Sequence, residues 1–307
     1  MLVSILIPCY NEEKNIPFLY NSLIQVIETF KNYDWEFLFI NDGSNDNSLA
    51  IIKNLSEKDN RVKYIDLSRN FGKEAAMLAG IDFVEGDAVI IMDADLQHPP
   101  SLIPEMIKEW ENGFDDVYAK RISRGKESNL RKKLSHIFYK TLNNDKGVKL
   151  LPNVGDFRLL DRKCIEAVKQ IRETERYTKG IFSWIGFKKK ELLFHQADRI
   201  AGASSMDYSK LMKLAINGYI SNTTFPLRLA TFIGFLVSLS GFFYMIFILI
   251  RTLLYGDEVR GFPTIIIIIL FIGGVQLISL GIIGEYIAQI THESKNRPVY
   301  FIQEKKL

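Results

Sequence analysis

Short apolar runs alternate with amphipathic stretches through the first part of the chain. Four of these runs, short and rich in β-branched residues, predict buried strands: Val3–Pro8, Glu36–Ile40, Val62–Leu67 and Ala88–Met92. Apolar residues recur at helical spacing in 14–31. Asn45 or Asp46 can cap a second helix that ends near Lys58, and a third helix is expected over 72–84, where small residues allow close packing. Strands that alternate with helices indicate parallel βαβ units with right-handed crossovers. The pattern therefore predicts an α/β domain with a Rossmann-like, mostly parallel sheet.

Two longer apolar stretches follow Pro226. The stretches Leu229–Ile250 and Phe262–Gly284 contain no charged residue, and a short polar segment, 251–261, joins them. Because a bilayer core requires roughly 20 apolar residues per helix, each stretch is long enough to cross it. We predict a transmembrane hairpin whose two flanking segments lie on the same side of the membrane. A modest excess of Lys and Arg in these flanks favours the cytoplasmic side.

These features divide the chain into six segments, and no cleavable signal is expected at Met1. The predicted segments are a cytoplasmic catalytic domain (1–205), an amphipathic juxtamembrane segment (206–226), a first transmembrane helix (227–251), a short extracytoplasmic loop (252–261), a second transmembrane helix (262–288) and a cytoplasmic tail (289–307). In the second span, small residues recur every seven positions at Gly274, Gly281 and Ala288. Such residues allow close helix packing in lipid, within the hairpin or between copies of the chain.

Charge and composition exclude several classes of function. The net charge is +3 without a long basic run, and no zinc-finger or basic-zipper pattern occurs, so nothing indicates nucleic-acid binding. Cys9 and Cys164 are far apart and are expected to be buried free thiols. No Gly-x-Gly-x-x-Gly or Gly-x-x-x-x-Gly-Lys-Ser/Thr motif follows the first strand, which disfavours a dinucleotide oxidoreductase and a P-loop NTPase.

Three predicted strands end in polar loops, at 10–12, 41–43 and 93–95. The carboxyl ends of parallel strands share one edge of a sheet, where ligands bind in open α/β folds. At this edge the carboxylates of Asp93 and Asp95 would repel each other without a cation, and oxygen ligands suit Mg²⁺ or Mn²⁺. Gln97 could add a neutral oxygen. Taken alone, the triplet 93–95 is equally compatible with a solvated turn.

These motifs resemble those of a known enzyme family. Residues 8–13, 41–44 and 93–99 look like the nucleotide-sugar motifs of family-two glycosyltransferases, in the branch of dolichol-phosphate mannose synthase. The later stretches 153–159, 179–184 and 199–202, with the predicted hairpin, resemble bacterial bactoprenol (undecaprenyl-phosphate) glucosyltransferases of the GtrB type. The resemblance covers essentially the whole chain. It implies an A-type glycosyltransferase domain that binds a nucleotide diphosphate sugar and Mg²⁺ or Mn²⁺.

The resemblance also implies roles for particular residues. The donor and its nucleotide would be bound by Pro8, Tyr10, Asn11, Glu12, Asp42, Asp93, Ala94, Asp95, Arg121, Lys179 and Arg199. The metal would be bound by Asp93, Asp95 and Gln97, and the acceptor phosphate by Arg131 and Ser135. Catalytic roles would fall to Asp93, Asp95, Asp156 and Arg199. One departure is that Gly202–Ser205 has serine where related enzymes often carry lysine, which weakens a phosphate-binding role there.

Several of these roles have alternatives. Asp156 could be a general base, a positioning residue or a structural partner of Arg158, and an acceptor phosphate that is already ionised needs no base. Arg121 could be a surface charge. The segment around Arg131 could be a solvated basic helix.

The activity implied by the resemblance is inverting transfer of glucose from UDP-glucose to undecaprenyl phosphate at a bacterial cytoplasmic membrane, for modification of a cell-envelope glycan. A separate flippase, a downstream glycosyltransferase and a tetrameric assembly are implied as partners. The alternatives are another donor, carrying GlcNAc, mannose or aminoarabinose, and a non-catalytic nucleotide-binding membrane scaffold. A processive polysaccharide synthase is disfavoured, because no Gln-x-x-Arg-Trp motif occurs.

Overall fold

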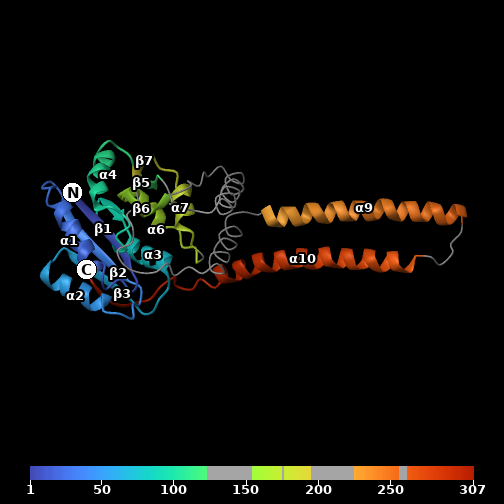
Figure 1. Ribbon diagram of the computed structural model, residues 1–307, viewed down its shortest axis with the longest axis horizontal. Helices are drawn as coiled ribbons and strands as arrows, with labels where there is room; N and C mark the ends of the chain where they lie inside the picture. The colour runs from blue at the N-terminus through green and yellow to red at the C-terminus, as the bar shows by residue number, and fades with distance from the viewer. Residues whose placement is uncertain (123–153, 175, 195–224, 256–260) are drawn as a thin grey trace. The chain divides into compact units, whose positions relative to one another are not determined.

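The computed structural model describes residues 1–122, 154–174, 176–194, 225–255 and 261–307 (Figure 1). These residues belong to two compact units. The first unit contains the described residues up to Phe194 together with Arg297–Leu307, and the second contains the two long helices near the C-terminus. The predicted tail, 289–307, is thus divided: residues up to Ser294 extend the last helix, and residues from Arg297 belong to the first unit.

Eight described strands form one mixed sheet in the first unit, in the order β7-β5-β6-β4-β1-β2-β3-β8. Their bounds are β1 Leu2–Cys9, β2 Asp34–Asn41, β3 Val62–Leu67, β4 Ala88–Ile91, β5 Asp116–Arg121, β6 Val154–Asp161, β7 Lys189–Phe194 and β8 Ile302–Lys306. Strands β3, β2, β1 and β4 pair in parallel, as predicted. Strands β6 and β8 run antiparallel to their neighbours. The mostly parallel α/β prediction is therefore confirmed.

Helices cover both faces of this sheet (Figure 1). Their bounds are α1 Ile16–Ile27, α2 Ser48–Lys58, α3 Lys73–Phe83, a 3-10 turn Pro100–Leu102, α4 Ile103–Glu111, α6 Arg162–Lys169 and α7 Thr178–Trp184. One apolar core joins the sheet to α1, α2 and α4, and a second joins it to α3, α6 and α7. Gly80 lets α3 approach β1 closely, because a Cβ there would lie 1.9 Å from Cδ1 of Leu6. Cys9 and Cys164 are buried free thiols, as expected.

The strand order places a switch point between β1 and β4. From β1 the chain adds β2 and β3 on one side, and then β4 on the other side. Such points in open α/β sheets leave a crevice at the carboxyl ends of the strands, where ligands bind. The loops after β1, β2, β3 and β4 all leave from this edge, because these strands are parallel.

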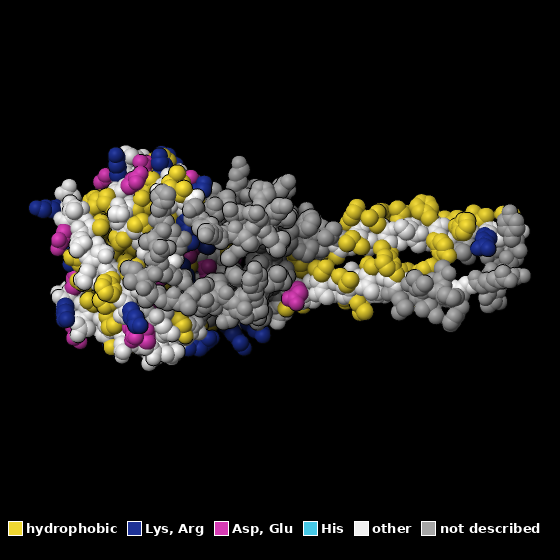
Figure 2. All heavy atoms as spheres, viewed as in Figure 1, with side chains coloured by type: hydrophobic (Ala, Val, Ile, Leu, Met, Phe, Trp, Pro, Cys, Tyr) yellow, Lys and Arg dark blue, Asp and Glu magenta, His cyan; other side chains and the backbone are white. Residues whose placement is uncertain are grey.

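The second unit consists of helices α9 (Phe225–Tyr255) and α10 (Phe262–Ser294). Within the described residues, one helix is long and apolar enough to cross a bilayer: α10 has a window, Phe271–Ala288, of mean hydropathy 1.6 and with no part buried. In α9 the described apolar stretch, Ala230–Tyr244, is shorter. Hydrophobic side chains line the exposed surfaces of both helices (Figure 2). This surface supports association with a membrane.

Two of the small residues of α10, Gly274 and Gly281, have open space beside them among the described atoms. A Cβ added to Gly274 or Gly281 would meet nothing within 4 Å. The described contacts therefore give no support to a role for these glycines within the hairpin, and a contact between copies of the chain stays a prediction.

Candidate active site

The loops that follow β1 and β2 are joined by hydrogen bonds into one rim. Asn11 has a φ of 58°, which asparagine tolerates, and its side-chain oxygen accepts a 2.9 Å hydrogen bond from the backbone N–H of Asn45. The backbone N–H groups of Asn11 and Glu12 donate to the hydroxyls of Ser44 and Ser48. Asp46, expected to cap the helix that follows, accepts from the N–H groups of both Ser48 and Glu13, although Asn47 directly precedes α2. The Tyr10 side chain is exposed beside this rim.

Asp42 fastens a third loop to this rim. Its carboxylate is buried and accepts hydrogen bonds from the backbone N–H groups of Phe71 (2.7 Å) and Gly72 (2.9 Å). Burial raises the pKa of Asp42, whereas the two N–H groups and the charge of Arg69 act to lower it. Asp42 is thus an anchor for the loop after β3. A direct contact between Asp42 and a nucleotide stays a prediction.

Gly43 allows this loop to lie directly against the end of β2. Its φ is +63°, and a Cβ there would lie 2.5 Å from the carbonyl carbon of Arg69. We expect Gly43→Ala to cost about 1–3 kcal/mol of stability, because both the backbone strain and the clash must be relieved. The thermal midpoint of the purified protein should fall, and nucleotide binding should weaken. Gly113→Ala is the matched control, since Gly113 also has a positive φ but nothing within 4 Å of an added Cβ. Equal losses of stability in the two variants would show that the close approach of the loop to Gly43 contributes nothing.

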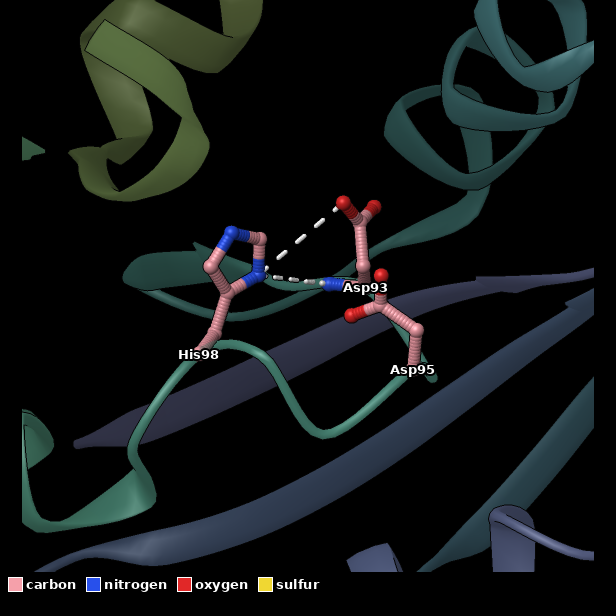
Figure 3. Close-up of side chains that lie close together, drawn as sticks. All are labelled: Asp93, Asp95 and His98. Atoms are coloured by element: carbon pink, nitrogen blue, oxygen red, sulfur yellow. Dashed lines mark hydrogen bonds and ion pairs between the residues drawn. The ribbon is translucent and has the colours of Figure 1, made fainter. Parts of the chain in front are cut away.

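Asp93 and Asp95 follow β4 directly, at the predicted edge (Figure 3). One ligand atom from each of Asp93, Asp95 and His98 lies within 4.8 Å of the others. The loop turns sharply at Leu96, whose φ of 61° is costly for this residue type and marks local strain. The backbone N–H of Gln97 donates to Asp95 across this turn (3.1 Å). Two carboxylates this close fit a hard divalent cation such as Mg²⁺ or Mn²⁺.

His98 stabilises the loop that contains the two aspartates. Its ring is buried and stacks on Phe157, with ring centroids 4.9 Å apart. Nδ1 accepts a 3.2 Å hydrogen bond from the backbone N–H of Asp93, so this lone pair is already engaged (Figure 3). Burial lowers the pKa of His98, which keeps the ring neutral at pH 7 despite the nearby carboxylate of Asp93. This hydrogen bond gives His98 a structural part, and the two aspartates are the candidates for acidic ligands.

Asp156 meets Asp93 because β6 is antiparallel to β4. Ile91, the last residue of β4, pairs with Arg158. Two residues past Ile91 and two residues back from Arg158, the same antiparallel register brings Asp93 opposite Asp156. The Lys73 ammonium bridges them: Nζ lies 2.6 Å from Oδ1 of Asp93 and 2.7 Å from Oδ2 of Asp156. The other Asp156 oxygen is buried and has no hydrogen-bond partner among the described residues. A buried carboxylate oxygen of this kind at the sheet edge can face a bound substrate.

The bridge has a clear electrostatic effect. Burial opposes ionisation of Asp156, but the charges of Lys73 and Lys179 outweigh it and hold its pKa well below the usual range. Burial also opposes the charged form of Lys73, and the carboxylates of Asp93 and Asp156 raise its pKa nonetheless. Both groups are therefore ionised at pH 7.

One alternative for Asp156 was an ion pair with Arg158, but among the described residues Asp156 pairs with Lys73. Arg158 is buried and donates to Asp116 instead, 3.1 Å from Oδ2. Its guanidinium also lies over the ring of Phe182, 4.0 Å from the centroid. These contacts hold β6 to β5 and α7.

The structure places some of the other predicted site residues, and the rest lie outside the described part of the chain. Pro8 pairs with Ile40 one residue before the end of β1, Arg121 ends β5, and Lys179 lies in the first turn of α7. Ala94 is buried between the two aspartates. Arg131, Ser135, Arg199, Gly202–Ser205 and nearly all of the juxtamembrane segment 206–226 lie outside the described residues.

Sequence reasoning overlooked Lys73 and Glu74. Both stand at the start of α3, directly after the loop held by Asp42. The signal was present: β3 was predicted, and the loop after it must reach the same edge as those after β1, β2 and β4.

Glu74 carries an unusual pKa. Burial, with the charge of Asp156, raises the pKa of Glu74 to about 7, although Thr178 donates to it from both backbone N–H and hydroxyl. The folded protein therefore holds a proton that the unfolded chain loses near pH 4.5, and stability from this group is lost as pH rises from about 4.5 through 7. We expect Glu74→Gln to increase the free energy of unfolding by up to about 3 kcal/mol at pH 8 but hardly at pH 5, and the thermal midpoint should rise accordingly at pH 8. An equal effect of the exposed control Glu105→Gln would contradict this.

Comparison with known proteins agrees with this geometry. Residues 4–169 match the family described as Glycosyl transferase family 2. The chain belongs to this family. Membership makes the protein a transferase with an A-type glycosyltransferase fold, and the sheet edge described above is its candidate active site. Residues 225–290 match the GtrB C-terminal hairpin, which is the part of the chain that contains α9 and α10.

Relatives of the chain extend over its full length. It is 43% identical to the bactoprenol glucosyl transferase of Shigella phage SfV, covering 100% of this chain and 99% of the relative. It is 42% identical to a prophage bactoprenol glucosyl transferase homolog of Escherichia coli K12, covering 100% of both. Among solved structures, glucosyl-3-phosphoglycerate synthase from Mycobacterium tuberculosis, in complex with Mn²⁺, UDP and phosphoglyceric acid, aligns with a TM-score of 0.47. It is 14% identical, covering 70% of this chain and 75% of that one, a likeness too distant to carry an argument.

Proposed function

We propose that this protein transfers glucose from UDP-glucose to undecaprenyl phosphate, a polyprenyl phosphate, and releases UDP. The observation that carries the proposal is the meeting of Asp93, Asp95, Lys73 and Asp156 at one sheet edge, in a family-two transferase that also has a GtrB hairpin. Full-length relatives named bactoprenol glucosyl transferase support glucose and the lipid acceptor.

The donor would bind along the rim formed by the loops after β1, β2 and β3. Tyr10 supplies an exposed aromatic surface, and Asn11 and Glu12 lie beside it. Asp42 would act chiefly by holding the loop after β3 in place. Asp93 and Asp95, with Gln97, would hold Mg²⁺ or Mn²⁺, and this ion would neutralise charge on the departing diphosphate.

The acceptor would approach from the side of Asp156. An oxygen of the lipid phosphate attacks the anomeric carbon of glucose, a new C–O bond forms, and the bond from that carbon to UDP breaks. A single in-line displacement inverts the anomeric centre. Because the lipid phosphate is already ionised and the pKa of Asp156 is held low, Asp156 would position the reacting groups and would accept no proton. Lys179 would add positive charge beside it.

The hairpin would keep this site at the membrane where the lipid phosphate lies. Strand β8 follows α10 in the chain and pairs with β3, which precedes α9. A chain that returns to the same sheet must cross a membrane an even number of times or not at all. An even number of crossings agrees with the multi-pass arrangement that we propose. The excess of Lys and Arg in the flanks of the hairpin favours the cytoplasmic side, so we place the catalytic domain on that side of a bacterial inner membrane. One hairpin offers no route by which the lipid-linked product could cross the membrane. A separate flippase and a downstream glycosyltransferase would therefore act on the product. A tetrameric assembly stays a prediction.

A transfer assay tests the proposal. Purified full-length protein in detergent is given undecaprenyl phosphate, Mg²⁺ or Mn²⁺, and one radiolabelled donor at a time: UDP-glucose, UDP-GlcNAc or GDP-mannose. Lipid-extractable label from UDP-glucose alone is the expected result. Label from another donor would preserve the reaction class and overturn the sugar. Nucleotide binding without transfer from any donor would favour a non-catalytic scaffold.

A further inference from the structure

Lys73 occupies a central position between the two sides of the site. Its Nζ is within hydrogen-bond distance of Asp93, which follows β4, and of Asp156, which stands near the start of β6. The Asp156 side chain is 9% exposed and that of Asp93 is 24% exposed, so both carboxylates are partly withdrawn from water. An ammonium group has three donors, and the described carboxylates accept from two of them. One lysine thus fixes the spacing of the donor-side and acceptor-side carboxylates.

This arrangement also affects the charge that a divalent ion would meet. Asp93 and Asp95 are the acidic candidates for binding the ion, since Nδ1 of His98 is engaged by a backbone N–H. One oxygen of Asp93 already contacts the Lys73 ammonium at 2.6 Å. A positive charge at that distance from a ligand repels a second cation and reduces the negative charge available to it. Affinity of the aspartate pair for a free ion is lowered accordingly.

We propose that Lys73 is a positioning residue that holds Asp93 and Asp156 in register and restrains divalent-ion binding until the nucleotide diphosphate supplies further oxygens. The inference rests on the proposed function, because it assigns Asp93 to the donor side and Asp156 to the acceptor side. Its consequence is positive coupling: the diphosphate increases the affinity for the ion, and the ion increases the affinity for the diphosphate equally. Metal and donor then arrive together.

The coupling can be measured without sugar or lipid. Mn²⁺ is titrated into full-length protein in detergent and followed by electron paramagnetic resonance, with and without UDP. In Lys73→Met the Mn²⁺ affinity without UDP should increase about fivefold or more, and the gain in affinity caused by UDP should shrink by a similar factor. In the transfer assay, the same variant should lose at least about tenfold in kcat, because Asp93 and Asp156 are no longer held together.

Further variants separate charge from structure. Lys73→Gln retains hydrogen-bond donors without the charge, should also bind Mn²⁺ more tightly, and carries the test if Lys73→Met does not fold. Lys73→Arg retains the charge and should keep Mn²⁺ affinity near that of the wild type. Lys163→Met is the matched control. Lys163 lies on α6, outside the site, and forms a 2.6 Å ion pair with Asp115, so its loss should change neither measurement.

Two results would overturn the inference. One is unchanged or weaker Mn²⁺ binding in a folded Lys73→Met or Lys73→Gln protein, and the other is full kcat in these variants. If the donor is not UDP-glucose, the Mn²⁺ titration is unaffected and the kcat comparison is made with the donor that the enzyme uses. Failure of the proposed function is therefore distinguishable from failure of this inference.

Discussion

Replacing Asp95 with asparagine is expected to reduce glucosyl transfer by about 1000-fold, the upper range for loss of one electrostatic contact in a transition state. The side chain keeps its size but loses the charge that would bind the divalent ion against the diphosphate. Lipid-extractable product formed per minute is the measurement, and EDTA treatment of the wild type should produce a loss of comparable size. The unliganded variant should also bind Mn²⁺ more weakly, which separates metal loss from a purely catalytic defect.

Asp34→Asn provides the control, because Asp34 is an exposed aspartate at the opposite edge of the sheet, at the start of β2. This variant should transfer glucose at the wild-type rate. Transfer that continues undiminished in EDTA, or in Asp95→Asn, would show that the paired carboxylates hold no catalytic ion.

Asp156→Asn is expected to reduce kcat by about 100-fold, because the substitution removes the charge that pairs with Lys73 and faces the reacting groups. The pH profile distinguishes positioning from base catalysis. The pKa of Asp156 lies well below the usual range, so this carboxylate stays ionised throughout the working range of pH. Protonation of the acceptor phosphate, whose second pKa is about 6, should produce a loss of rate near pH 6. Glu74, whose pKa is about 7, titrates in the same range, so the profile is measured in the Glu74→Gln background. The acid limb should therefore persist unchanged in Asp156→Asn.

Disappearance of that limb in the variant would identify Asp156 as the general base. Asp115→Asn is the control for charge removal, since Asp115 also pairs with a lysine at 2.6 Å but lies outside the site. A 100-fold loss in that variant would point to a general effect of removing a paired carboxylate.

The sheet and the strand-end loops could be predicted from sequence because both depend on local patterns. Continuous apolar runs are typical of strands buried on both faces, and Val62–Leu67 was predicted with the bounds that β3 has. Parallel pairing then brings the polar ends of β1, β2 and β4 to one edge. The carboxylates Asp93 and Asp95 were found in this way.

The remaining parts of the site depend on pairings between segments distant in the sequence. Asp156 reaches Asp93 only because β6 runs antiparallel to β4. The sequence of residues 154–161 does not indicate whether this strand pairs in parallel or antiparallel. Strand β8 was missed because Ile302–Lys306 is short and highly charged. Charged residues are typical of edge strands, which lack the apolar alternation that reveals a strand in sequence.

Strand β8 has a consequence for the biosynthesis of the protein. During translation, β1 to β7 leave the ribosome before the hairpin, while the strand that pairs with the outer edge of β3 is made after it. Until then that edge has unpaired backbone groups, which can recruit strands from other chains. Once β8 is added, Glu304 accepts hydrogen bonds from Lys53 and Tyr64 and fastens the strand. If the hairpin inserts into the membrane as proposed above, the catalytic sheet is completed only after the hairpin has been made. Nascent chains that are delayed at this step are then the ones most exposed to aggregation.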